Sequence, residues 1–174
     1  MDLGLRGSRA LITGGSRGIG LAIGDVLAAE GVAVGLIARD PDSLAGAARR
    51  LARHGIQVAT AAADVTDTPA LDRAVGEIAA ALGGLDHLVA NAGGTVGGGN
   101  LTNSSAGDFT ATFALNAGHA AELIRAGLGH LRAAGGGSVV IISSITGTRP
   151  APRTAYAAAK AAEIQLAATA GQEL

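Results

Sequence analysis

The chain has 174 residues, of which 48% are hydrophobic and 16% are charged, and its formal net charge is −1. That length suits one domain with a sizeable core, and the near-neutral charge points to neither nucleic acid nor a membrane surface as a partner. The absence of cysteine excludes disulfides and thiolate metal sites, the spacing of the four histidines suggests no metal site, and no apolar run approaches the roughly 18 residues of a membrane helix. A cytoplasmic protein is therefore the default expectation.

The first predicted element is a short buried strand over residues 10–13, which leads through the glycine-rich stretch 13–20 into a helix. Strand, glycine turn and helix in this order form the first unit of a nucleotide-binding sheet. In such a unit Gly14 permits a tight turn, Gly18 lets the backbone approach a pyrophosphate, and Gly20 lets the helix pack close to the strand. Phosphates would then meet free N–H groups at the helix N-terminus. Taken alone, the glycine pattern fits an ordinary glycine-rich turn equally well.

Apolar runs typical of buried parallel strands alternate with amphipathic helical patterns along the rest of the chain. The strands are expected at residues 32–38, 57–62, 87–91 and 138–143, and the helices begin near residues 19, 41, 68, 105 and 154, the fourth reaching about residue 133 and the last running to residue 174. This alternation predicts an α/β fold with a doubly wound parallel sheet and strand order 3-2-1-4-5. Since no domain boundary is evident, residues 1–174 are expected to form a single dinucleotide-binding domain.

The loosest stretch of the sequence is 93–105, which is rich in glycine, threonine, asparagine and serine. It could be a flexible connector. It could also be a loop over the carboxyl end of the fourth strand, where such sheets bind ligands.

Tyr156 and Lys160 are four residues apart on the last predicted helix and therefore share a face. A lysine ammonium near a phenol favours the phenolate, which makes tyrosine a usable general acid near neutral pH. Ser143 and Ser144 close the fifth strand, so their hydroxyls can meet the start of that helix at the same edge of the sheet. Each feature alone has a simpler interpretation, namely an exposed tyrosine beside a solvated lysine, or serines that form a turn or a cap.

Taken together, these motifs resemble the short-chain dehydrogenase/reductase family, most closely its 3-oxoacyl-acyl-carrier-protein reductase-like members, over essentially all 174 residues. Such a resemblance implies a Rossmann sheet and a nicotinamide cofactor. Ala90 departs from the family pattern, because many members have asparagine there. The matching motifs, in chain order, are Thr13-Gly14-x-x-x-Gly18-x-Gly20, Asp64-Val65, Asn91-Ala92-Gly93, Asn116, Ser144 before Ile-Thr-Gly, and Tyr156-x-x-x-Lys160.

The resemblance implies a role for each residue of the site. Tyr156 would donate a proton to a carbonyl oxygen as hydride arrives, and Lys160 would assist it and hold the nicotinamide ribose. Ser144 would bind the substrate oxygen, with Ser143 as the fallback, and Asn116 would hold a water that links Lys160 to solvent at a local break in the long helix. The implied cofactor-binding residues are Gly14, Ser16, Arg17, Gly18, Ile19, Gly20, Arg39, Asp64, Val65, Asn91, Ala92, Gly93, Tyr156 and Lys160, among which Asn91 is expected to brace the sheet and the cofactor.

NADP(H) is the expected cofactor, with NAD(H) as the alternative. In NAD-preferring relatives an acid ends the second strand and binds the ribose hydroxyls, and that position here is Ala38. Arg39 follows directly and Arg17 lies in the glycine loop, so two guanidinium groups could bind a 2′-phosphate. Asp40 could neutralise Arg39, but we expect it to cap the next helix, with Pro41 at the first helical position.

The sequence lacks the further strand, the Pro-Gly motif, the substrate lid and the last strand that relatives of about 250 residues carry after the Tyr-Lys helix. The helical pattern still runs at Leu174 with no cap in sight, so we expect the chain to be the N-terminal part of a longer protein.

Three functions compete. An NADP(H)-dependent reductase of a small carbonyl compound, or dehydrogenase of the corresponding alcohol, is the first. A non-catalytic cofactor-binding regulator or assembly partner is the second, and the intact Ser-Tyr-Lys-Asn set argues against it. A flavodoxin-like or sugar-nucleotide enzyme is the third and fits the glycine spacing less well. The resemblance also implies a homodimer or homotetramer formed through the long helix and the alanine-rich final helix.

Overall fold

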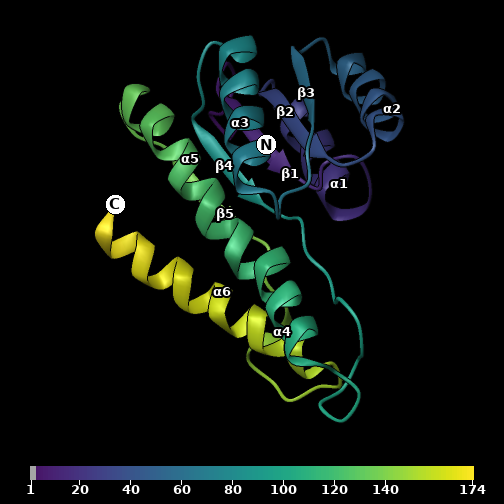
Figure 1. The fold of residues 1–174 in the computed structure, drawn as a ribbon. Coiled ribbons are helices and arrows are strands. Elements are labelled where there is room, and N and C mark those ends of the chain that lie inside the picture. The colour runs from purple at the N-terminus through teal and green to yellow at the C-terminus, as the bar shows by residue number, and fades with distance from the viewer. Residues whose placement is uncertain (1–2) are drawn as a thin grey trace.

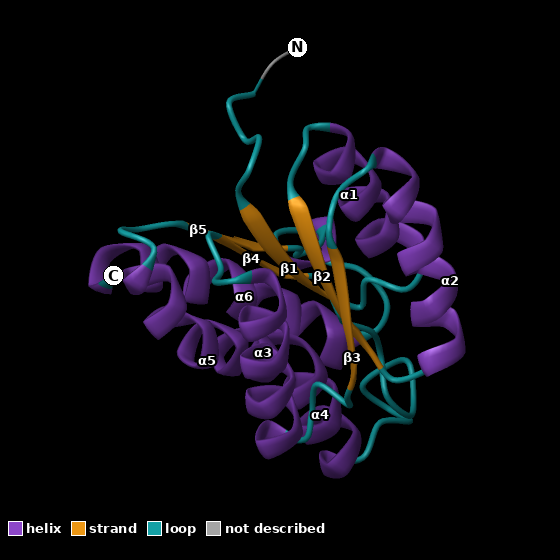
Figure 2. Ribbon diagram, turned by 90° about the horizontal axis from the view of Figure 1, so that it is seen from above, coloured by secondary structure: helices purple, strands orange, loops and turns teal. Residues whose placement is uncertain are grey.

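A parallel sheet with helices on both faces forms the frame of the protein, as the computed structural model shows for residues 3–174, the part of the chain that it describes (Figures 1 and 2). The strands are β1 (Arg9–Thr13), β2 (Ala33–Ala38), β3 (Val58–Ala62), β4 (His87–Ala90) and β5 (Ser138–Ile141). The helices are α1 (Gly18–Ala29), α2 (Pro41–Leu51), α3 (Thr68–Leu82), α4 (Ala106–Phe113), α5 (His119–Ala133) and α6 (Thr154–Glu173), with short 3-10 turns at Ala52–His54 and Ile145–Gly147.

The order of the strands across the sheet is β3-β2-β1-β4-β5, with every neighbouring pair parallel. This confirms the predicted fold class and strand order. Each strand lies within one or two residues of its predicted range, which is the usual uncertainty at the ends of an element. The order puts the carboxyl ends of β1 and β4 side by side at the centre of the sheet, where strand connections diverge and ligands bind in sheets of this type.

Two apolar cores lie on opposite faces of the sheet because successive side chains of a strand point to opposite sides. On β1, Leu11 belongs to the core that also contains Ile78 of α3 and Leu123 of α5. Its neighbour Ile12 belongs to the core beneath α1 and α2. Figure 2 shows α1 and α2 on one face of the sheet and α3, α4, α5 and α6 on the other.

The helix that leads away from β2 begins at a side-chain cap. Asp40 accepts hydrogen bonds from the backbone N–H groups of Asp42 (3.2 Å) and Ser43 (3.3 Å), with Pro41 at the first helical position. The expectation that Asp40 caps this helix is therefore confirmed. The Asp40 carboxylate is thus held at the helix terminus by these bonds.

The long helix predicted over residues 105–133 is interrupted where the break was expected. A π-helical segment, η2 (Ala114–Gly118), separates α4 from α5, and Asn116 lies at its centre, fully buried. Single π turns inside α-helices are rare and recur at functional sites. Within residues 3–174, no helix combines the length and the apolar character needed to cross a membrane.

Candidate functional site

The glycine turn between β1 and α1 has the backbone conformation that glycine permits. Gly14 has φ +65°, and its N–H donates to the carbonyl of Ile37 on β2 at 2.8 Å. Arg17 precedes α1 and forms no side-chain cap on the helix. The first N–H groups of α1 therefore receive no side-chain cap from Arg17, which leaves them available to a phosphate.

Gly20 is required by close packing. A Cβ at this position would lie 2.5 Å from Asn91 Nδ2 and closer still to the carbonyl oxygen of Gly14. Gly18, in contrast, has nothing within 4 Å of its would-be Cβ. Gly20 therefore allows α1 to sit against the turn, whereas Gly18 faces the open space in front of it.

Asn91 braces the turn from β4. Its Nδ2 donates to the carbonyl oxygen of Thr13 at 2.9 Å, and the backbone N–H groups of Asn91 and Ala92 donate to Thr13 Oγ1 at 3.0 and 3.2 Å. From behind, His119 Nε2 lies 3.2 Å from the same Oγ1, while its Nδ1 lies 2.9 Å from the Leu115 carbonyl oxygen. Burial lowers the pKa of His119 to about 4, so the ring is neutral at neutral pH.

A cavity of about 540 Å³ opens at this edge of the sheet. It gathers eleven of the predicted cofactor-binding residues; Gly20, Tyr156 and Lys160 are not among those lining it. Sequence reasoning missed Ser43, Ala63 and Leu115, which also line the cavity. Ser43 could have been found from its place three residues after a helix cap; Ala63 and Leu115 carry no such signal. The predicted residues in the lining are Gly14, Ser16, Arg17, Gly18, Ile19, Arg39, Asp64, Val65, Asn91, Ala92 and Gly93.

The end of the cavity beside β2 carries two arginines. Arg17 and Arg39 both line it, and Ala38, the last residue of β2, has no carboxylate. Asp40 also lines the cavity, with its carboxylate capping α2. The pKa of Asp40 is lowered by the Ser43 hydroxyl and the capping N–H groups, with a smaller effect of Arg17. The pKa of Asp64 is lowered by its bonds from Thr66 and by Arg39. Free N–H groups at the start of α1 and the exposed guanidinium groups of Arg17 and Arg39 can bind the phosphate groups of a dinucleotide.

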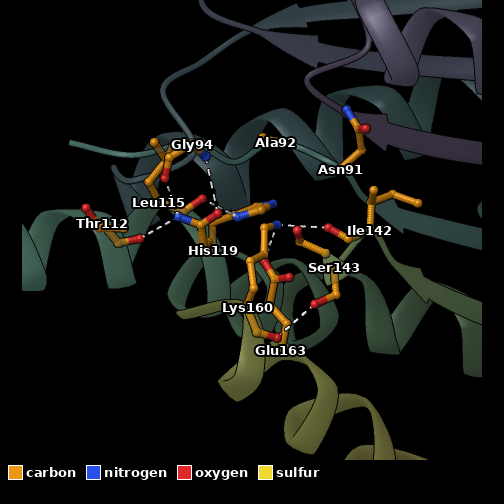
Figure 3. A network of polar contacts seen from close by, with 12 residues as sticks. Asn91, Ala92, Gly94, Thr112, Leu115, His119, Ile142, Ser143, Lys160 and Glu163 are labelled. Atoms are coloured by element: carbon orange, nitrogen blue, oxygen red, sulfur yellow. Dashed lines mark hydrogen bonds and ion pairs between the residues drawn. The ribbon is translucent and has the colours of Figure 1, made fainter. Parts of the chain in front are cut away.

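The predicted tyrosine and lysine meet on α6. Lys160 Nζ lies 5.5 Å from the centroid of the Tyr156 ring, and Tyr156 is partly exposed whereas Lys160 is buried. Lys160 Nζ donates to the carbonyl oxygen of Ile142 at 2.8 Å and to Glu163 Oε1 at 2.9 Å (Figure 3). Glu163 is also buried, and sequence reasoning missed it. The spacing in the sequence could have identified Glu163, because an acid three residues after a lysine lies on the same face of a helix.

The Asn-Ala-Gly triplet connects this pair to the cavity. A Cβ at Gly93 would lie 2.7 Å from Asn116 Oδ1 and 3.1 Å from Lys160 Nζ. Because Gly93 has no side chain, the backbone that lines the cavity can lie directly against Asn116 Oδ1 and Lys160 Nζ.

Asn116 holds the loop after β4 with its side chain. Its Nδ2 donates to the carbonyl oxygens of Gly94 (2.8 Å) and Thr112 (2.6 Å), and its Oδ1 accepts from the N–H of Gly94 at 3.2 Å. The amide hydrogens are therefore used within the protein. The resemblance implies that Asn116 binds a water. That water would have to donate a hydrogen bond to an oxygen of Asn116.

The two serines after β5 differ in what their hydroxyls do. Ser143 Oγ donates to the backbone carbonyl of Lys160 at 2.8 Å, which commits its hydrogen to α6. Ser144 Oγ accepts from the N–H and the hydroxyl of Thr146 at 3.2 and 3.0 Å. A hydroxyl that accepts these bonds keeps its own hydrogen available to a ligand, so the geometry favours Ser144 over Ser143 as the substrate-binding serine.

Comparison with known proteins gives a consistent result. Residues 8–174 match the family model for short chain dehydrogenases. An uncharacterised oxidoreductase of Mycobacterium tuberculosis is 38% identical over 156 residues, which cover 88% of this chain and 59% of that protein. The chain thus spans about three-fifths of the length of that relative.

Solved structures agree in fold over the whole chain. L-sorbose reductase from Gluconobacter frateurii, complexed with NADPH and L-sorbose, superposes with a TM-score of 0.95 at 34% identity, covering 99% of this chain and 66% of that one. NAD+-bound xylitol dehydrogenase superposes with a TM-score of 0.92 at 27% identity, covering 97% and 65%. Relatives of this fold therefore bind either nicotinamide dinucleotide.

Proposed function

The chain belongs to the short-chain dehydrogenase family, and from that premise we propose that its protein is an NADP(H)-dependent oxidoreductase that reduces a carbonyl group or oxidises a secondary alcohol. One observation carries the proposal. The Lys160 ammonium lies 5.5 Å from the centroid of the partly exposed Tyr156 ring and against Gly93 in the wall of the dinucleotide-sized cavity.

The residues of the chain divide the work of such a reaction. Tyr156 donates its phenolic proton to the carbonyl oxygen during reduction and takes it back during oxidation. The Lys160 ammonium stabilises the phenolate that remains, and Ser144 donates a hydrogen bond to the same substrate oxygen. Asn116 fixes the loop that passes over Lys160. The cofactor, when bound, supplies or accepts the hydride.

Each cofactor-binding residue is assigned the part of the cofactor that it would contact. The N–H groups at the start of α1 receive the pyrophosphate, with Gly18 leaving room for its approach. Asp64 and Val65, which line the cavity, would contact the adenine. Arg17 and Arg39 bind the 2′-phosphate, which is the basis for expecting NADP(H) rather than NAD(H).

A direct assay tests the proposal. The protein is mixed with NADPH or NADH and a panel of ketones that includes a ketose and a 3-oxoacyl thioester, and the absorbance of the reduced cofactor is followed. Loss of absorbance that depends on both ketone and protein supports it. Tight cofactor binding without turnover on any ketone or alcohol would favour the alternative, a non-catalytic relative that works as a regulator or assembly partner.

We also propose that the protein forms a homodimer or homotetramer through the long helix and α6. The exposed apolar side chains Phe113 of α4 and Ile164 of α6 support this, since 48% and 40% of their surfaces remain exposed. Light scattering at micromolar concentration should give at least twice the mass of one chain. A monomer would contradict it.

A further inference from the structure

We propose that Glu163 is a positioning residue that weakens the electrostatic effect of Lys160 on Tyr156. The proton donor thereby stays protonated to a higher pH than it would beside a lysine that has no carboxylate partner. This inference rests on the proposed function only in calling Tyr156 the proton donor. Its structural basis is the buried ion pair between Lys160 and Glu163 on α6 (Figure 3).

The pair is almost completely enclosed. The side chains of Lys160 and Glu163 are 3% and 1% exposed, and Nζ lies 2.9 Å from Oε1. A buried ammonium or carboxylate is strongly unfavourable unless it is paired, so each group depends on the other. Glu163 Oε2 has no hydrogen-bond partner among the described residues, which leaves Lys160 as the main support of the carboxylate charge.

The geometry makes Glu163 act on Tyr156 through Lys160. A lone ammonium 5.5 Å from the ring centroid presents a full positive charge to a phenolate. With a carboxylate bound to the same nitrogen, the phenolate instead meets an ion pair, whose negative charge offsets part of the attraction of the ammonium. Less stabilisation of the phenolate leaves the phenol protonated over a wider pH range than a lysine without a carboxylate partner would allow.

His119 and Ser143 also pack near the pair, and neither carries a charge at neutral pH. His119, which approaches from α5, is neutral at neutral pH because burial lowers its pKa to about 4. Ser143, from the segment after β5, is uncharged, and its hydroxyl donates to the backbone carbonyl oxygen of Lys160. Burial itself raises the pKa of Glu163 against the opposing effect of Lys160. The carboxylate charge is therefore maintained by its lysine partner rather than by the surroundings.

The experiment titrates Tyr156 directly, with neither cofactor nor substrate present. The near-ultraviolet absorbance of tyrosinate is followed against pH, and the matching titration of Tyr156→Phe is subtracted so that the difference reports Tyr156 alone. In Glu163→Gln the side chain keeps its shape and a carbonyl acceptor for Nζ but loses its charge. The midpoint of tyrosinate formation should then fall by about one pH unit, roughly a tenfold increase in the ionisation constant.

Matched variants separate the effect of the Glu163 charge on Tyr156 from a general effect of removing a negative charge from the protein. Glu173→Gln makes the same change of charge at an exposed position on the same helix and should leave the midpoint in place. Glu163→Asp keeps the charge and should stay near the wild-type midpoint. In a Lys160→Met background the unpartnered Glu163 carboxyl should take up a proton, so adding Glu163→Gln should have no further effect.

A midpoint that is unchanged or raised in Glu163→Gln would overturn the inference. If that variant does not fold, Glu163→Leu removes the charge without burying an amide and should show the same downward shift; a midpoint left in place there would overturn it equally. Failure of the proposed function is distinguishable, because a protein without turnover can still show the shift, and an active enzyme can lack it.

Discussion

Asn91 Nδ2 donates to the carbonyl oxygen of Thr13 at 2.9 Å while the N–H of Asn91 donates to Thr13 Oγ1 at 3.0 Å, so two residues join the carboxyl ends of the two central strands. Both bonds lie directly behind the glycine turn. His119 reaches the same Oγ1 from α5. The shape of the turn therefore depends on β4 and on the long helix as well as on its own glycines.

Acid should destabilise the fold through His119. The folded-state pKa of about 4 is below the ordinary value of 6.5, so the unfolded chain binds a proton that the folded chain does not. Stability is fully present above pH 6.5 and is lost as the pH falls towards 4, by up to about 3 kcal/mol. Urea unfolding across this range should show the loss in wild type and a flatter dependence in His119→Gln. His130→Gln, at a partly exposed site on the same helix, serves as the control; equal slopes for both variants would contradict the assignment.

Replacing Gly20 with alanine should damage the turn. The new Cβ would press on the Gly14 carbonyl and on Asn91 Nδ2, and overpacking of this kind costs about 1–3 kcal/mol. We expect lower stability in urea together with weaker cofactor binding by titration calorimetry. Gly76→Ala is the matched control, because that helical position has nothing within 4 Å of the new Cβ and should gain about 0.5–1 kcal/mol. An unaltered cofactor affinity in Gly20→Ala would show that the turn tolerates displacement.

Replacing Tyr156 with phenylalanine should lower turnover by roughly 10²–10⁴-fold while leaving cofactor affinity nearly unchanged, because the lost hydroxyl acts in the transition state. Lys160→Ala should impair both turnover and cofactor binding. Steady-state rates and cofactor titrations on the two variants provide the comparison. Retention of more than about a tenth of wild-type activity by the phenylalanine variant would assign the proton transfer to another group.

An Arg17→Ala, Arg39→Ala double variant should lose NADP(H) affinity and keep NAD(H) affinity nearly constant. Each charge-assisted contact to the 2′-phosphate is worth about 1.5–3 kcal/mol, so the wild type should prefer NADP(H) by tenfold or much more. Arg49→Ala, Arg53→Ala removes the same two charges from exposed positions that do not line the cavity, and it should leave both affinities in place. Equal affinities of wild type for the two cofactors would rule out the preference.

Local sequence patterns predicted the sheet and its strand order, and the family resemblance supplied many of the residues that line the cavity. Hydrophobic runs locate β1 to β5, glycine spacing locates the first turn, and the Asp40-Pro41 pair locates the start of α2. These features are set by residues close together in the chain, and the crossover rule supplies their order.

The features that the sequence did not predict depend on contacts between segments that are far apart in the chain. The spacing of Lys160 and Glu163 was visible in the sequence, but their burial follows from packing of α6 against the end of β5. In the sequence, His119 likewise looks like an ordinary helical histidine. Its contact with Thr13 appears only in the folded structure, where it directly follows η2. Ala63 and Leu115 line the cavity only because β3 and η2 converge there. No local pattern encodes such convergence.

The brace between Thr13 and Asn91 also dictates an order of events during synthesis. The two residues are 78 positions apart, whereas β1 can pair with β2 as soon as residue 38 has emerged from the ribosome. Until β4 emerges, the nascent chain carries a glycine turn held only by β2. The later pairing of β1 with β4 spans more of the chain and should therefore be slower than the pairing of β1 with β2. A nascent chain should therefore acquire cofactor-dependent protection from proteolysis only after residue 91 has left the exit tunnel.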